Sequence, residues 1–166
     1  MIHRRMIVPA LFALAALQAC TSADPAKVQA DIEKAQADGQ KIVAEAQAKL
    51  DKVRAENTKD VVLAQADARK EAADAIARGE TTPAAAAAPG ADNDVAETRN
   101  DAVQKTLDAQ FDLDKARAEA NYKVADAHCD MQSGLGRKAC KETAKAVYDT
   151  NLATAKTRKG ARSQRG

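Results

Sequence analysis

The side chains with the widest chemistry in this chain of 166 residues are three cysteine thiols and the imidazole of His128. Cys20 follows an apolar run near the N-terminus, whereas Cys129 and Cys140 flank a short segment that contains two glycines. His128, Asp130 and the two later cysteines could be read as metal ligands, but two cysteines and one histidine beside a turn fall short of a closed zinc site. We therefore expect no metal and no cofactor. We also expect no enzyme activity, because no catalytic partner for His128 is evident.

Residues 1–19 have the layout of a secretory signal peptide. His3, Arg4 and Arg5 form a basic start, and the apolar run over residues 6–17 is too short to span a bilayer comfortably. Export would place the rest of the chain in an oxidising compartment. There a disulfide between Cys129 and Cys140 is the default expectation.

The segment Leu17-Gln18-Ala19-Cys20 resembles the lipobox of bacterial lipoproteins. In that family the cysteine is acylated, the signal is cut off just before it, and the mature protein starts at the lipid-bearing residue. The resemblance implies lipidation of Cys20, and it leaves Cys129 and Cys140 as an even pair. Thr21 stands where an aspartate would imply retention in the inner membrane, so the implied location is the periplasmic face of the outer membrane. The alternative is cleavage after Ala23 and release into the periplasm.

Composition predicts an all-α, elongated protein. Hydrophobic residues make up 45 %, but alanine supplies most of them, aromatic residues are 2 % and Trp is absent. Alanine is the best helix former and has little side chain to bury, so the chain forms helices more readily than it packs them. After a lipidated tether over residues 20–24, Asp24 as N-cap and Pro25 in the first turn predict the start of a long helix over residues 25–78.

A narrow apolar stripe runs along residues 25–78, at spacings mostly of three and four: Val28, Ile32, Ala35, Ile42, Ala46, Val53, Val61, Ala64 and Ala68. Such an alanine-rich stripe is typical of a coiled-coil seam, but it also fits a single helix that is solvated all round. Asn57 interrupts the stripe, and its spacing drifts from a strict heptad. The sequence therefore does not decide whether residues 25–78 form a homo-oligomer.

The second half of the chain predicts a helical hairpin. Residues 79–93 form a flexible Pro/Ala linker, and residues 94–157 form two antiparallel helices around the turn Ser133-Gly134-Leu135-Gly136. The midpoint between Cys129 and Cys140 falls inside this turn. Residues equidistant from it should lie at the same height, which pairs the two cysteines, Ala125 with Ala144, and Tyr122 with Val147.

The first helix of the hairpin carries apolar stripes on nearly opposite sides. One stripe contains Leu107, Phe111, Ala118, Tyr122, Ala125 and Cys129; the other contains Leu113, Ala116, Ala120, Val124, Ala127 and Met131. Two apolar sides suggest two neighbours. One is the next helix, and the other is either the helix over residues 25–78 or a second copy of the chain.

Charge is segregated between the two halves of the hairpin. Residues 94–132 hold nine acidic and five basic residues, whereas residues 137–166 hold nine basic and two acidic ones. An acidic strip should therefore face a basic strip. Residues 158–166 are expected to form a disordered basic tail. Its counter-charges would be anionic envelope polymers or solvent alone rather than nucleic acid, because the tail lacks aromatic residues for stacking on bases.

The region over residues 117–157, with Tyr122-Lys123-Val124-Ala125 before Cys129 and Ala144-Lys145-Ala146 after Cys140, resembles a group of small, mostly uncharacterised exported proteobacterial proteins. Some of these are labelled TolA-like cell-envelope proteins because of their Ala/Lys/Glu-rich helices. The overall plan is also similar to the major outer-membrane lipoprotein, although the terminal lysine that this family joins to peptidoglycan has no counterpart at Gly166. These resemblances imply a lipid-anchored helical cell-envelope protein with a structural or adaptor role. The alternative is a soluble periplasmic binding or stress-response protein.

Overall fold

The computed structural model describes residues 24–79 and 89–164, and every regular element within them is an α-helix. Helix α1 spans Pro25–Ala77, α2 spans Pro89–Cys129 and α3 spans Gly134–Ser163. The all-α prediction is confirmed for this part of the chain. Residues 1–23, which contain the expected signal peptide and Cys20, lie outside the described residues.

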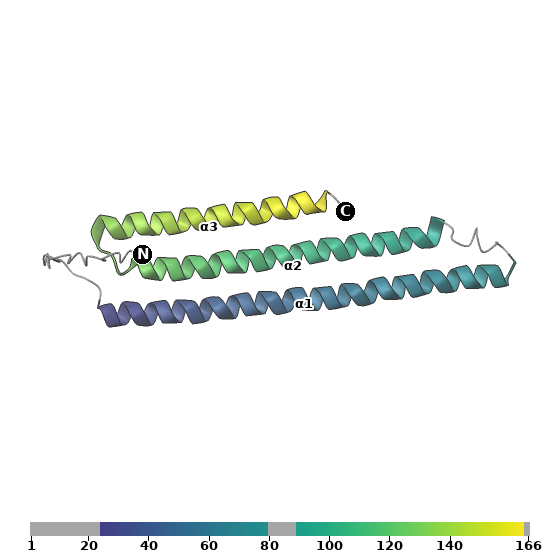
Figure 1. Cartoon of the computed structure of the whole chain (residues 1–166), viewed down its shortest axis with the longest axis horizontal. Coiled ribbons are helices and arrows are strands. Elements are labelled where there is room, and N and C mark those ends of the chain that lie inside the picture. The colour runs from purple at the N-terminus through teal and green to yellow at the C-terminus, as the bar shows by residue number, and fades with distance from the viewer. Residues whose placement is uncertain (1–23, 80–88, 165–166) are drawn as a thin grey trace, which may run out of the picture.

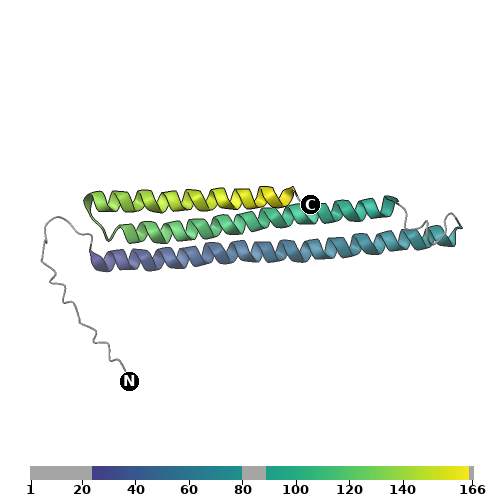
Figure 2. The same ribbon diagram turned by 45° about the horizontal axis from the view of Figure 1, so that its top comes forward.

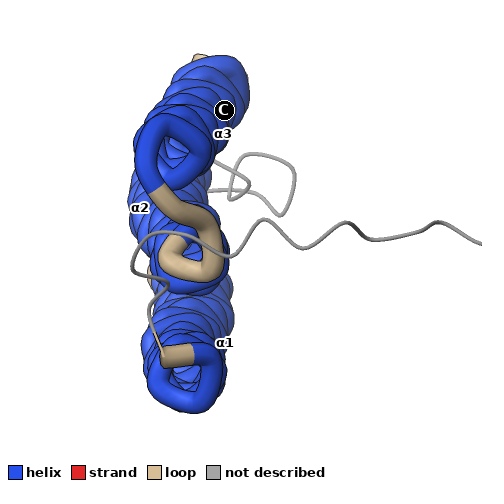
Figure 3. The backbone as a smooth tube through the Cα atoms, turned by 90° about the vertical axis from the view of Figure 1, so that its left-hand side faces the viewer, coloured by secondary structure: helices blue, strands red, loops and turns tan. Residues whose placement is uncertain are grey.

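The three helices lie side by side in a single layer with α2 in the middle (Figure 1, Figure 3). Both α1 and α3 pack on α2, and within the described residues they do not contact each other. Consecutive helices run in opposite directions, so the start of α1 and the turn between α2 and α3 lie at the same end of the molecule (Figure 2). With 53 residues, α1 is roughly 80 Å long at 1.5 Å per residue. The described part is thus a rod rather than a closed bundle.

Helix α1 begins at the residue that the sequence predicts and ends one residue before the predicted end. The Asp24 carboxylate accepts a hydrogen bond from the backbone N–H of Ala26 at 3.0 Å, and Pro25 occupies the first turn. At the other end, Gly79 has a φ of 70°, a left-handed conformation that glycine adopts without steric cost.

Small and aliphatic residues form the contact between α1 and α2. Leu50, which is 1 % exposed, packs with Ala109 and Leu113 at its centre. Gly39 lies directly against α2, because a Cβ placed on it would come within 3.0 Å of the Ala120 Cβ. The apolar stripe of α1 therefore packs on α2 within the same chain. The second neighbour of α2, which the sequence left open, is α1. The two helices are thus in contact, although the residues between them were predicted to form a flexible linker.

The predicted linker is also shorter than expected. Helix α2 begins at Pro89, so residues 89–93 are helical, while residues 80–88 lie outside the described part. Similarly, α3 begins at Gly134, inside the segment predicted as a turn.

The basic segment over residues 158–163 belongs to α3, although it was expected to be disordered. Its side chains have partners on α2 that the sequence reading did not assign to it. Lys159 Nζ lies 2.5 Å from Asp108 Oδ1, and Ser163 Oγ lies 3.1 Å from Gln104 Oε1 in a hydrogen bond. These contacts extend the hairpin to residue 163.

Candidate functional site

Cys20, the expected lipidation residue, lies outside the described residues. The described part begins at Asp24, the N-cap of α1, and the packing of α1 on α2 defines where this end of the helix lies. The contacts of Leu50 with Ala109 and of Gly39 with Ala120 fix the register of α1 on α2. Each residue toward the start of α1 moves the contact about one residue toward the end of α2, because both helices rise by 1.5 Å per residue. The first turn of α1 is therefore level with the turn that follows Cys129.

A disulfide joins Cys129 and Cys140, whose Cα atoms lie 5.5 Å apart. Cys129 is the last residue of α2 and is buried, whereas Cys140 lies in the second turn of α3 and is half-buried. The connecting backbone is also held by hydrogen bonds. The Gln132 N–H donates to the Cys129 carbonyl at 3.0 Å, and the Arg137 Nε donates to the Gln132 carbonyl at 2.8 Å. The disulfide and these bonds fix the end of the hairpin.

Acidic and basic side chains meet along the hairpin as charge segregation predicts. Lys141 Nζ lies 3.1 Å from Asp130 Oδ1 and 3.3 Å from Asp126 Oδ2, and Arg158 pairs with Asp114 at 3.9 Å. In each ion pair between α3 and the rest of the hairpin within the described residues, the base belongs to α3. The hydrogen bond to Asp130 is the main reason that the pKa of Lys141 lies above its ordinary value of 10.5. Asp126 adds to this increase.

Tyr122 packs on Tyr148, with ring centroids 5.4 Å apart, one residue beyond the Val147 that was predicted to lie level with it. Val147 is 54 % exposed. Helical side chains lean toward the N-terminus of their own helix, which points in opposite directions on two antiparallel helices. The partner of Tyr122 therefore lies one residue further from the turn than the Cα positions alone suggest.

A groove of about 660 Å³ lies between α1 and α2 near the level at which α3 ends. Its apolar lining includes Val61, Val62, Val103 and Leu107. Asn57, which the sequence reading treated as an interruption of the stripe, is buried beside it. Its Nδ2 donates to the Ala102 carbonyl at 2.7 Å and to the Thr106 Oγ1 at 2.9 Å. Sequence reasoning missed this groove because it depends on how α1 pairs with α2, although the apolar run Val61-Val62-Leu63 was visible.

The end of the hairpin exposes apolar side chains that the sequence reading did not single out. We call residues 130–136 the hairpin tip. Met131 is 68 % exposed and Leu135 is 86 % exposed. Met131 was expected on the second apolar stripe of the first hairpin helix, but α2 ends at Cys129 and Met131 lies beyond it in the turn. The sequence signal for an exposed Leu135 was its position between Gly134 and Gly136, in a predicted turn.

The described residues contain no group of three or more His, Cys, Asp or Glu side chains placed to hold a metal ion. His128 is exposed at the end of α2. None of the helices in residues 24–79 and 89–164 combines the length and the apolar character needed to cross a membrane.

Protein-family models, curated proteins and solved structures provide no match to this chain.

Proposed function

We propose that this protein is a lipid-anchored helical rod of the bacterial cell envelope with a structural or adaptor role, held at the periplasmic face of the outer membrane by lipid on Cys20. The observation that carries the proposal is the segment Leu17-Gln18-Ala19-Cys20 at the end of an apolar run, with Cys20 four residues before the N-cap Asp24. Four extended residues span at most roughly 14 Å. A lipid on Cys20 would therefore hold the rod close to the membrane by one end.

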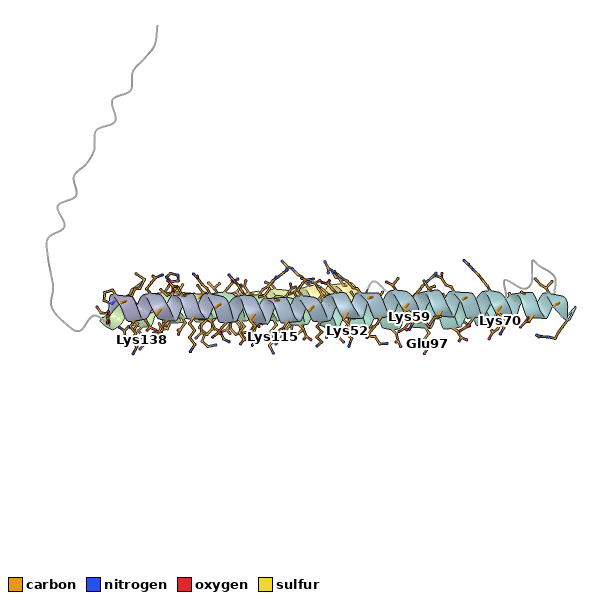
Figure 4. The ribbon with its side chains drawn as sticks, turned by 90° about the horizontal axis from the view of Figure 1, so that it is seen from below. Lys52, Lys59, Lys70, Glu97, Lys115 and Lys138 are labelled. Atoms are coloured by element: carbon orange, nitrogen blue, oxygen red, sulfur yellow. A yellow bond between two sulfur atoms is a disulfide. The ribbon has the colours of Figure 1, made fainter. Side chains whose placement is uncertain are left out.

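The shape of the described part supports a structural or adaptor role. One end of the rod would be tied to the bilayer, and the other end of α1 lies roughly 80 Å away along the helix axis. Charged side chains line the length between them, and Lys52, Lys59 and Lys70 are spread along α1 (Figure 4). The Cys129–Cys140 disulfide suits an oxidising periplasm. An anchored rod of this kind can hold a partner at a set distance from the membrane.

Two partner classes remain part of the proposal. Anionic envelope polymers fit the basic side of α3, where Lys156 and Arg162 have no ion pair within the described residues. A homo-oligomer would have to use a different side of α1 from the stripe that packs on α2. The exposed Leu63 is available for such a contact.

A second candidate function is that of a soluble periplasmic binding protein, and the groove beside Asn57 favours it. Its walls carry Val61, Val62 and Val103, which would accept an apolar ligand or peptide side chain. In this case a general signal peptidase would cut after Ala23 and no lipid would be present.

Fractionation of cells that produce Cys20→Ser tests the proposed function. Without the thiol no lipid can be attached, so the protein should be released from membranes or remain as an unprocessed precursor. Ser22→Ala, which changes a neighbouring polar residue, is the matched control and should fractionate like the unaltered protein. Thr21→Asp should move the protein to the inner membrane. A Cys20→Ser protein that still fractionates with the outer membrane would contradict the proposal.

A further inference from the structure

We infer that the hairpin tip is a second membrane contact, which inserts Leu135 and Met131 into the surface of the same phospholipid bilayer that holds the lipid on Cys20. The inference rests on the proposed lipid anchor and adds a site to it. The bilayer would then be contacted at two places, by the lipid on Cys20 and by the hairpin tip between α2 and α3.

The exposure of the tip is the first observation that carries this inference. Met131 and Leu135 are 68 % and 86 % exposed, the highest values for large apolar side chains in the described residues. The Cys129–Cys140 disulfide closes the loop that carries them and holds the tip at the end of the hairpin. Leu135 lies in the first turn of α3, where a helical side chain leans toward the N-terminus of its helix. It therefore leans toward the end of the rod.

The position of the tip is the second observation. The start of α1 and the tip lie at the same end of the rod (Figure 1), and the packing of Gly39 on Ala120 makes them level. Asp24 is joined to Cys20 by a tether that spans at most roughly 14 Å. A lipid on Cys20 thus brings the tip to the bilayer surface without any change in the described structure.

Charge near the tip identifies the surface as a bilayer that contains anionic phospholipids. Arg137 and Lys138 directly follow the tip. Arg137 pairs with Asp130 of the tip at 3.8 Å, whereas Lys138 lies at this end of the rod and extends the basic charge beyond that pair (Figure 4). The Lys138 side chain is 76 % exposed and its nearest carboxylate, on Glu142, is 4.0 Å away. Basic side chains beside exposed apolar ones are the combination that binds at a membrane interface.

The anchor explains why so small a contact suffices. Two apolar side chains alone would bind vesicles weakly, because stable attachment usually takes a lipid chain together with a second signal. Once the lipid is inserted, docking of the tip becomes an intramolecular step at a high effective concentration. The tip then sets how the rod stands on the membrane rather than whether it binds.

The absence of Trp from the chain allows a direct test. The lipidated full-length protein carrying Leu135→Trp is reconstituted in vesicles of zwitterionic and anionic phospholipids, with and without brominated acyl chains. We expect the Trp at position 135 to emit at shorter wavelength in vesicles than in buffer without vesicles. We also expect the brominated lipid to quench it several-fold more strongly than the Trp of Val147→Trp. Val147 is the matched control, because it is also exposed and apolar on α3 but lies three turns further along the helix.

Equal quenching at positions 135 and 147 would overturn the inference. A shorter emission wavelength at position 135 without bromine quenching would also overturn it, because the tip would then contact another protein or a second copy. Met131→Trp provides a second probe should Leu135→Trp fail to fold. Intact mass of the same sample separates the two proposals: lipid without quenching leaves the anchor standing, whereas absence of lipid overturns both.

Discussion

Breaking the Cys129–Cys140 disulfide should destabilise the protein by about 3 kcal/mol, from the chain entropy released when a loop of this length is opened. The rest of the hairpin offers little compensation. Ion pairs such as Lys159–Asp108 lie at the surface, contribute about 0–1 kcal/mol each and weaken with salt. For a domain of this size, the loss corresponds to a fall in Tm of roughly 10 °C. Because α1 packs on α2, helicity of α1 should fall together with that of the hairpin.

Circular dichroism of Cys140→Ser across a heating scan measures this effect. Cys140 is the better position to change, because it is less buried than Cys129. The serine hydroxyl is then partly exposed, and the thiol of Cys129 stays in the buried position. Reductant should lower the Tm of the unaltered protein, most clearly at high salt, and leave the Tm of Cys140→Ser unchanged. An equal Tm with and without reductant in the unaltered protein would refute the reasoning. Free thiols at both positions in protein from oxidising cells would show that the bridge is absent.

Three further predictions concern the contacts between helices. Gly39→Val should destabilise the protein by about 1–3 kcal/mol because its side chain meets Ala120, whereas the control Gly160→Ala, with open space around it, should stabilise it by about 0.5–1 kcal/mol; equal effects in urea unfolding would contradict the close packing. Asn57→Ala should cost about 1–2 kcal/mol in the same assay, since its buried hydrogen bonds are lost, and a neutral result would argue against this polar contact. Lys141→Met should remove a pH-dependent part of the stability. Because the folded state raises the pKa of Lys141, this part is full below pH 10.5 and is lost as the pH rises through the higher value; an identical alkaline profile for the variant would exclude it.

The hairpin register could be predicted from the sequence because a covalent constraint and a turn marked the same midpoint. Cys129 and Cys140 flank the glycines symmetrically, and the charges on either side are complementary. The ring contact of Tyr122 with Tyr148, one residue beyond Val147, was not predicted, because side chains were treated as if they pointed straight out from the helix axis. The direction of the Cα–Cβ bond shifts the true partner by one position.

The partner of α1 could not be predicted in the same way. Its stripe passed over Leu50 and read Asn57 as a break, yet both are buried against α2. Alanine is so frequent that several sides of the helix look equally apolar, and the contact is chosen by a few residues. Leu50 fills the space beside Leu113, Gly39 permits close approach, and Asn57 finds a carbonyl to bond. The basic end of α3 was misread for a related reason, since partners of its side chains, such as Asp108, lie on another helix.

The measurement that tests the central claim most directly is the intact mass of the mature protein purified from cell envelopes. The proposed anchor predicts a chain that starts at Cys20 and carries the additional mass of a diacylglyceryl group on that residue. Fragmentation should place this mass on the first residue and find Cys129 and Cys140 two hydrogens lighter than free thiols. A mature chain that starts at Asp24 and carries no lipid would contradict the account.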